Sequence, residues 1–159
     1  MIDDYASQPG YTQEFFKDCL LRGGWKPVSL EEDLYLIIHQ GKTGAFPIYG
    51  KFVPAKCLVS FSGVHPYPVS NEKLSAVLEY INYTNYGVPF GNLELRESTN
   101  EVCFRTGLMF FNIELTGQLI NNLIHDCAQA MDRYTPGVSM IVESNLSVKQ
   151  AYEATISKS

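Results

Sequence analysis

The sequence predicts an α+β domain in which helices flank a twisted antiparallel sheet. Apolar runs with strand character occur in two groups, and amphipathic segments with helical spacing precede, separate and follow them. This order fits a layered α+β architecture, and 159 residues suit one domain. We therefore predict a single domain over 1–159 with its core at 11–156 and a flexible segment at 1–10. The expected order is helix, three strands, helix, two strands, helix and a short C-terminal helix.

Four helices are predicted from apolar positions that recur every three or four residues. Their expected ranges are 11–22, 70–87, 116–134 and 147–156. Ser70 and Ser147 are the expected N-caps, since a serine side chain accepts hydrogen bonds from the first helical N–H groups. The third helix is expected to end at Thr135-Pro136-Gly137, because a proline interrupts helical hydrogen bonding.

Five strands are predicted from short runs rich in β-branched and aromatic residues. Their expected ranges are 34–39, 45–53, 56–62, 90–97 and 101–111, the last two forming a hairpin. Pro47 has no N–H for a strand ladder, so we expect the strand 45–53 to lie at a sheet edge or to contain a bulge. The candidates for contact with a partner at this edge are Tyr35, Ile37, Ile48 and Tyr49.

Composition excludes several classes of partner. The net charge is −5 and the basic residues are scattered, whereas binding to nucleic acid or anionic lipid requires clustered Lys and Arg. The sequence contains neither a secretory signal nor a run of about 18 apolar residues. We therefore expect a soluble cytoplasmic protein. Its four cysteines form no CxxC pair, so we interpret them as buried hydrophobic residues and expect no metal and no cofactor.

Residues suited to catalysis are few. The three histidines, His39, His65 and His125, are not near one another in sequence, and no phosphate-binding loop, nucleophile elbow or metalloprotease motif is present. His125 lies beside Asp126 on a predicted helix, where we expect a surface position. The sequence therefore predicts a protein that is not an enzyme.

The strand 101–111 is the first candidate binding element. One face carries Val102, Phe104, Thr106, Leu108 and Phe110, and the other becomes apolar as well, through Cys103, Met109 and Phe111. A half-exposed antiparallel strand normally alternates apolar and polar residues. We therefore expect the second face to be covered, either by the C-terminal tail or by another subunit. Arg105 on that face would need a partner, and Glu94 across the hairpin is a candidate.

Three tyrosines are the second candidate. Tyr80, Tyr83 and Tyr86 recur every three residues along the second predicted helix. Tyrosine is amphipathic and loses little side-chain entropy when fixed, which favours protein-binding surfaces. The alternative is that the rings extend the core and leave their hydroxyl groups in water.

Several sequence strings resemble the bacterial YbjN family, whose members are described as regulators of sensory transduction. These strings are Asn82 and Asn85, PFG at 89–91, EVCFRTGL at 101–108, LTGQL at 115–119, DRYTPG at 132–137 and NLSVKQAYEATI at 145–156. The resemblance covers roughly 11–156. It implies a fold similar to that of type III secretion chaperones and a tendency to form homodimers.

The pattern and the resemblance together indicate a protein-binding module. We expect a chaperone-like adaptor or regulator that binds a protein client or a second copy of itself, with no nucleic acid and no membrane as partner. The alternative hypothesis is a small-ligand sensor with a cavity between the sheet and the helices.

Overall fold

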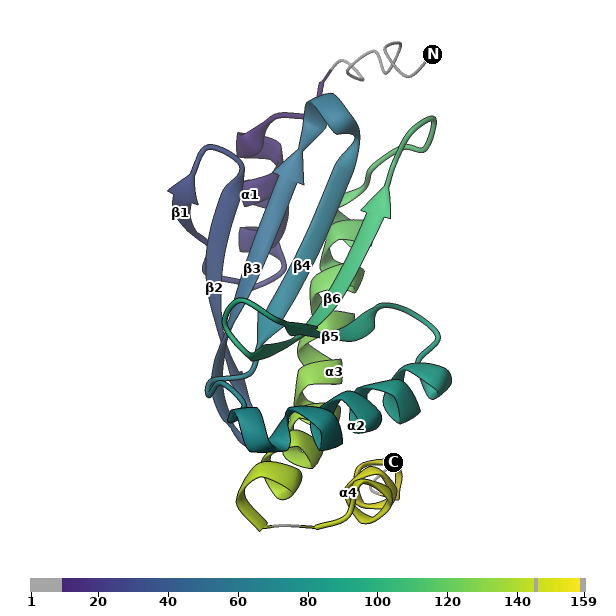
Figure 1. The fold of residues 1–159 in the computed structure, drawn as a ribbon. Helices are drawn as coiled ribbons and strands as arrows, with labels where there is room; N and C mark the ends of the chain where they lie inside the picture. Colours follow the sequence, from purple (N-terminus) through teal and green to yellow (C-terminus); the bar gives the residue numbers. More distant parts are fainter. Residues whose placement is uncertain (1–9, 145, 158–159) are drawn as a thin grey trace.

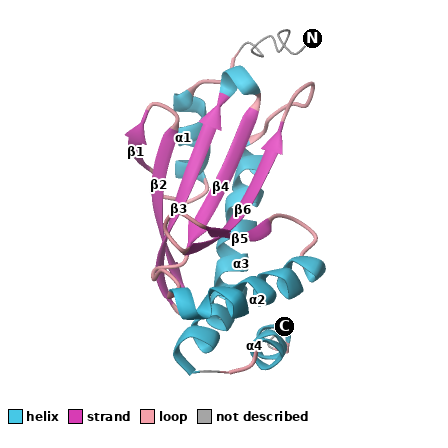
Figure 2. Cartoon of the chain, in the orientation of Figure 1, coloured by secondary structure: helices cyan, strands magenta, loops and turns pink. Residues whose placement is uncertain are grey.

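The computed structural model describes residues 10–144 and 146–157 and shows an α+β fold (Figures 1 and 2). A six-stranded antiparallel sheet has the order β1-β2-β3-β4-β6-β5. The strands are β1 (Val28–Glu31), β2 (Leu34–Gly41), β3 (Gly44–Val53), β4 (Leu58–Val64), β5 (Asn92–Arg96) and β6 (Glu101–Met109). The helices are α1 (Gln13–Arg22), α2 (Leu74–Gly87), α3 (Gly117–Ser144) and α4 (Val148–Ile156). The predicted fold class is confirmed, while the flexibility expected for 1–9 concerns residues outside those described.

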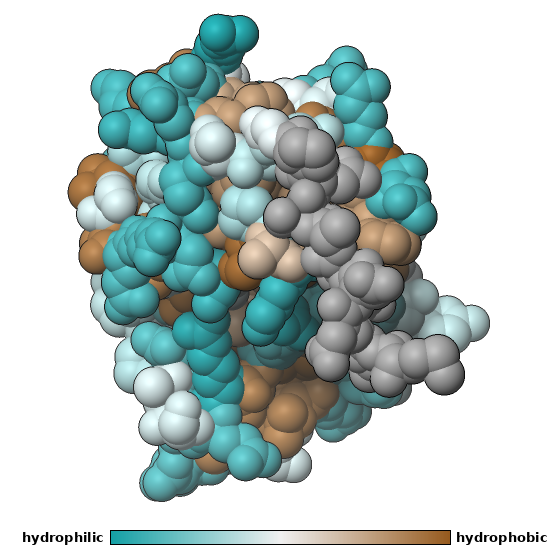
Figure 3. Space-filling view, turned by 90° about the horizontal axis from the view of Figure 1, so that it is seen from above, coloured by the Kyte–Doolittle hydropathy of each residue, from teal (hydrophilic) through white to brown (hydrophobic). Residues whose placement is uncertain are grey.

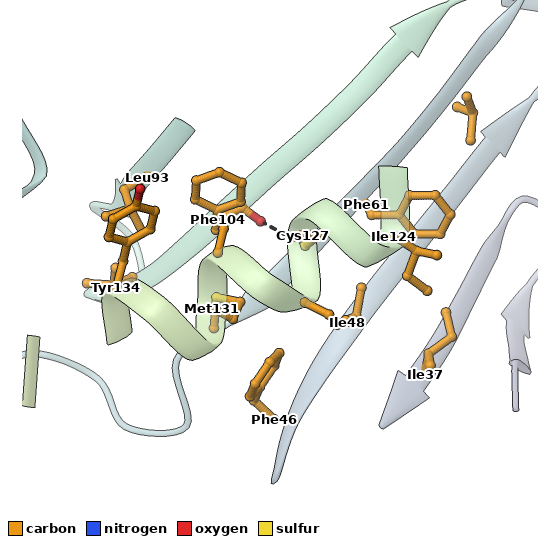
Figure 4. Packing of buried hydrophobic residues seen from close by; sticks show 14 of the residues in the cluster. Ile37, Phe46, Ile48, Phe61, Leu93, Phe104, Ile124, Cys127, Met131 and Tyr134 are labelled. Carbon is orange, nitrogen blue, oxygen red and sulfur yellow. Dashed lines mark hydrogen bonds between the residues drawn. The ribbon is translucent and has the colours of Figure 1, made fainter. Parts of the chain in front are cut away.

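The core lies between one face of the sheet and the helices α1 and α3, which lie behind the sheet in Figure 1. Successive side chains of a strand point to opposite faces, so alternate residues of β2, β3, β4 and β6 meet α3. Figure 4 shows Ile48, Phe61 and Phe104 directed toward this helix. From α1, Phe16 stacks on Phe52 with ring centroids 4.9 Å apart. Full burial of each such side chain contributes about 1.5–3 kcal/mol.

The edge position expected for the strand containing Pro47 is wrong. Strand β3 lies between β2 and β4, and the short outer strand β1 was not predicted. Pro47 pairs with Ile38 of β2, whereas the pairing of β3 with β4 begins only at Ile48. At Pro47 the strand therefore has a neighbour on one side only, which is the situation in which a strand tolerates proline.

The four sheet-edge candidates accordingly lie away from an edge. Tyr35, Ile37 and Ile48 are buried under the helices, and Tyr49 lies on the opposite face between Leu36 and Ser62. The edges of the sheet are β1 and β5.

Helix α3 continues through Pro136 to Ser144, so the end predicted at Thr135-Pro136-Gly137 is wrong. Pro136 costs one helical hydrogen bond, but Val138 and Ile141 continue the buried stripe beyond it. Packing also requires Gly137, because an added Cβ there would lie 2.2 Å from the hydroxyl oxygen of Tyr80. Tertiary contacts therefore outweigh the helix-breaking preference of proline.

The caps and the junction after α2 differ in part from expectation. Ser147 forms the predicted N-cap of α4, as part of a capping box with Gln150. Ser70 makes no side-chain capping bond, since a short 3-10 helix at Asn71–Lys73 precedes α2. The side chain of Asn85 does not cap its helix but bonds to both the N–H and the C=O of Leu93, at 2.8 and 3.0 Å. This pair of bonds fixes α2 against β5.

Candidate functional site: the open sheet face and the α3 groove

The face of the sheet opposite α1 and α3 is here called the open face. Its central part carries Leu36, Ile38, Pro47, Tyr49, Lys51, Val53, Leu58, Ser60, Ser62, Arg105, Gly107 and Met109. Ile38 and Met109 are 54% and 57% exposed. Figure 3 views the molecule from the end at which α1 begins, and it shows hydrophobic residues in patches between hydrophilic ones. The exposure of Ile38 and Met109, and not this end view, shows that the open face presents apolar side chains to solvent.

The apolar residues of the open face form two groups, and charged residues lie near both. Lys51 of β3 lies between Tyr49 and Val53, pairs with Ser60 of β4, and forms an ion pair with Asp33 at 3.5 Å. Leu36, Ile38 and Tyr49 lie on β2 and β3, whereas serines and the ion pair between Arg105 and Glu94 lie on β4, β6 and β5. The register places Val53, Leu58 and Met109 side by side at the upper end of the sheet in Figure 1. Ser60 and Gly107 have small side chains between these groups, with Lys51 beside Ser60 and the Arg96 side chain over Ser62.

The structure separates the residues predicted on the second face of strand 101–111. Cys103 is fully buried because Arg96 reaches from β5 across β6 and donates a hydrogen bond to the Ser62 Oγ at 3.2 Å. Met109 and Phe111 stay exposed. The C-terminal tail forms helix α4, which packs against α2 and α3 and not against the open face. The expectation that the tail covers Met109 is therefore wrong. The predicted ion pair between Arg105 and Glu94 is confirmed.

The three tyrosines of α2 do not share one surface. Tyr80 is fully buried, and its hydroxyl donates a hydrogen bond to the Tyr134 carbonyl at 2.8 Å. Tyr83 is half exposed and packs its ring on Tyr152 of α4 at 6.0 Å. Only Tyr86, at 97% exposure, is fully accessible. An α-helix has 3.6 residues per turn, so a step of three residues falls short of a full rotation. The three tyrosines therefore point in successively different directions, from the core toward solvent.

Both edges of the sheet carry features that hinder pairing with another strand. Strand β1 has four residues, follows Pro27 and contains an irregularity between Ser29 and Glu31. Strand β5 carries the charged side chains of Glu94 and Arg96. Short length, proline, bulges and charge are the means by which natural sheets avoid edge-to-edge association. The open face is therefore a better docking surface than either edge.

A second surface, here called the α3 groove, follows the second half of α3. It consists of two adjoining hollows of about 700 and 390 Å³. The β2–β3 turn lines both hollows, helix α4 lines the first, and the loop at 65–67 lines the second. The two hollows share Thr43, Pro136 and Met140. The sequence analysis missed this groove because it ended the helix at Tyr134. The helical spacing of residues up to Glu143 could have indicated that the helix continues.

Asp132 of α3 holds the β2–β3 turn at the groove. One carboxylate oxygen lies 3.3 Å from the His39 Nε2, and the other accepts a hydrogen bond from the Lys42 backbone N–H at 2.8 Å. A Cβ added at Gly41 would lie 2.1 Å from this second oxygen. A larger residue at position 41 would therefore displace the Asp132 carboxylate, and this carboxylate, bonded to His39 and to the Lys42 N–H, holds the turn.

His65 fixes the neighbouring loop. It is buried, its Nδ1 lies 2.8 Å from the Tyr67 carbonyl oxygen, and its Nε2 lies 3.2 Å from the Ser139 Oγ. Burial lowers the pKa of His65 below its ordinary value of 6.5. The shorter of the two contacts at Nδ1, 2.8 Å to the Tyr67 carbonyl against 3.3 Å to the Tyr67 N–H, assigns the proton to Nδ1, and Nε2 then accepts from the Ser139 hydroxyl. His125 is exposed as predicted, with its ring 5.0 Å from that of Trp25.

The cysteines are buried and free, as predicted. Burial raises the pKa of Cys127 to about 12 and also raises the pKa of Cys19 and Cys103. The thiol form is therefore favoured over the thiolate, which is the reactive and metal-binding form. Across 10–144 and 146–157, no group of three or more His, Cys, Asp or Glu residues is placed to hold a metal ion.

Two further findings concern the whole described chain. None of the helices in the described ranges combines the length and the apolar character that crossing a membrane requires. Comparison with models of protein families, with curated proteins and with solved structures finds no match.

Proposed function

We propose that this chain is a non-enzymatic protein-binding module, a chaperone-like adaptor that holds an apolar segment of a client polypeptide on its open face. The observation that carries the proposal is the exposure of Ile38 and Met109 on a sheet face that no helix of the described chain covers. Contiguous exposed apolar groups are characteristic of interaction sites. Ile38 has the partly exposed apolar neighbours Leu36, Pro47 and Tyr49, and Met109 has Leu58 and Val53. The small residues Ser60 and Gly107 lie between the two apolar groups, and Lys51 and Arg96 beside them could contact polar groups of the same segment.

A site on the surface is favoured over the alternative of a ligand cavity between sheet and helices. That space contains Phe61, Phe104, Ile124 and Cys127, whose exposure is at most 1% (Figure 4). In keeping with the resemblance to the YbjN family, we place the adaptor in the bacterial cytoplasm. The other possible occupant of the open face is a second copy of the chain, which would give the homodimer that the resemblance implies. The experiment below distinguishes a client from a second copy.

The test uses a chemically unfolded client. Reduced α-lactalbumin aggregates through exposed apolar segments, and light scattering reports its aggregation. The wild type is expected to suppress scattering, and the variants Ile38→Glu and Met109→Glu are expected to lose this effect, because a carboxylate on the open face opposes burial against an apolar segment. Leu21→Glu is the matched control, since Leu21 is a similarly exposed apolar residue on α1.

The result that contradicts the proposal is equal suppression by the wild type and by both open-face variants, or no suppression by any of them. Sedimentation velocity of the same proteins identifies the other occupant. A wild-type dimer that both open-face variants convert to monomer would show that a second copy occupies the open face.

A further inference from the structure

The sulfur atoms of the described residues differ strongly in exposure. All four cysteines are buried, and burial raises the pKa of three of them, which favours the thiol over the thiolate that oxidants attack. Met131 has no exposed area, and Met140 is partly exposed in the α3 groove. Within the described ranges, the sulfur-containing side chain that is most open to solvent is therefore Met109, at 57% exposure.

The end of strand β6 explains why Met109 is accessible. Strand β5 pairs with β6 only over 101–105, so no strand of the described chain pairs with β6 on that side at Met109. Gly107, two residues earlier on the same face, has no side chain that could shield the thioether. On the other side Met109 is opposite Leu58, which is in turn opposite Val53. The thioether is thus open to solvent, while its neighbours on the open face are apolar.

A thioether in such a position reacts with hydroperoxides. A lone pair of the sulfur attacks one oxygen of the peroxide, so an S–O bond forms as the O–O bond breaks. A proton transfer then leaves water, or an alcohol where the oxidant is an organic hydroperoxide. The sulfur loses two electrons and the peroxide gains two, so the reaction needs no further reactant. The product is methionine sulfoxide, a polar and chiral group in place of a flexible apolar one.

We propose that Met109 is a redox modification site, at which oxidation by a hydroperoxide switches off the binding of clients to the open face. A client segment that covers Met109 beside Leu58 and Val53 would also bury the sulfoxide oxygen among apolar groups, which costs free energy. The fold itself tolerates the change, because Met109 is largely exposed in the free protein. The loss of binding rests on the proposed function, whereas the modification of Met109 does not.

The site of modification is measured on the full chain. The protein is treated with dilute hydrogen peroxide, catalase removes the excess, and peptide mass spectrometry follows the addition of oxygen to each methionine and cysteine. Met109 is expected to be oxidised faster than Met131 and Met140, and the cysteines are expected to remain thiols. Oxidation of Met131 or of a cysteine at the rate of Met109 in the folded protein would overturn the assignment of the site.

The effect on binding is measured by the aggregation of reduced α-lactalbumin, with each protein compared with its own untreated sample. The oxidised wild type is expected to require about tenfold more protein for half-maximal suppression. Met109→Leu keeps an apolar side chain of similar volume but lacks the sulfur, so peroxide should not change its suppression. Met109→Gln should act like the oxidised wild type before any treatment. Met140→Leu is the matched control and should stay sensitive to peroxide.

Three results would overturn the proposed switch. The first is equal suppression by untreated and oxidised wild type once mass spectrometry shows complete oxidation of Met109. The second is an equal loss of suppression in peroxide-treated Met109→Leu, which would place the sensitive group elsewhere. The third is loss of the folded state on oxidation, which circular dichroism detects.

Failure of the proposed function gives a different result. No suppression by the untreated wild type would contradict client binding and the switch that depends on it. Mass spectrometry would still decide whether Met109 is the residue that hydroperoxides modify. An unchanged suppression after oxidation, with a normal effect of Ile38→Glu, would instead overturn the switch and leave the proposed function intact.

Discussion

The two faces of the sheet are built from the same strands and differ in what covers them. On the face under α1 and α3, Phe61 and Ile48 have no exposed area, whereas Ile38 and Met109 on the open face are more than half exposed. Both faces contain large apolar residues, so hydrophobic content alone does not separate core from surface. The covered face buries most of the apolar area and therefore contributes most of the stability, and the proposed binding would use the other face.

The largest expected effect compares one apolar residue from each face. Phe61→Ala should lower the free energy of unfolding by about 3–5 kcal/mol, because it removes a ring packed against Phe16 and leaves a cavity. Ile38→Ala should change it by less than about 0.5 kcal/mol, since Ile38 is largely exposed. Urea unfolding measures both values. Equal losses in the two variants would show that the open face is also a core face.

Two glycines give a second comparison. A Cβ at Gly63 would lie 2.6 Å from the Met131 Cγ under α3, whereas a Cβ at Gly107 on the open face would lie 3.2 Å from the Ser60 Cβ. Gly63→Ala should therefore cost about 1–3 kcal/mol of unfolding free energy through overpacking. Gly107→Ala should cost less. The reverse order in thermal or urea unfolding would contradict the close packing of α3 on the sheet.

The pH dependence of stability tests the burial of His65. Its pKa in the folded state lies below 6.5, so below pH 6.5 the unfolded chain binds a proton more readily than the folded one. Stability should therefore be fully present above pH 6.5 and fall as the pH decreases, with a slope of at most about 1.4 kcal/mol per pH unit from this group. His65→Asn should show a shallower decrease between pH 7.5 and 5.5. An identical decrease would assign the dependence to other groups.

The smallest expected effect concerns the cover over Cys103. Because Arg96 lies between Cys103 and solvent on the open face, Arg96→Ala should expose this thiol with little loss of stability. Ellman's reagent should then modify Cys103 in the folded variant but not in the wild type, as peptide mass spectrometry can show. Equal protection in both proteins would mean that another group covers Cys103.

The sequence was sufficient for the elements with strong periodicity and insufficient where distant segments meet. The apolar stripes predicted all four helices, and Ser147 was correctly predicted as the N-cap of α4. Strand β1 was missed because it is short, follows Pro27 and has no buried residue to give it an alternating pattern. Local rules placed the end of α3 at Pro136, although the stripe through Val138 and Ile141 continues.

The candidate surfaces were harder to predict than the elements. Met109 was predicted as a contact residue and is exposed. Tyr80 is buried against Tyr134, which is distant in sequence, and Cys103 is buried beside Arg96, on the neighbouring strand of its own hairpin. The α3 groove requires the β2–β3 turn, α3 and α4 to come together in space. No local pattern contains that information, since it depends on the order of strands in the sheet and on the packing of the tail helix.

The most direct test of client binding on the open face is the rate at which Met109 is oxidised by dilute hydrogen peroxide, followed by peptide mass spectrometry with and without saturating reduced α-lactalbumin. Met140 lines the α3 groove and Met131 is buried, so both serve as internal references. The account predicts that the client slows the oxidation of Met109 and leaves the rate at Met140 unchanged. An unchanged rate at Met109 under saturating client would contradict it.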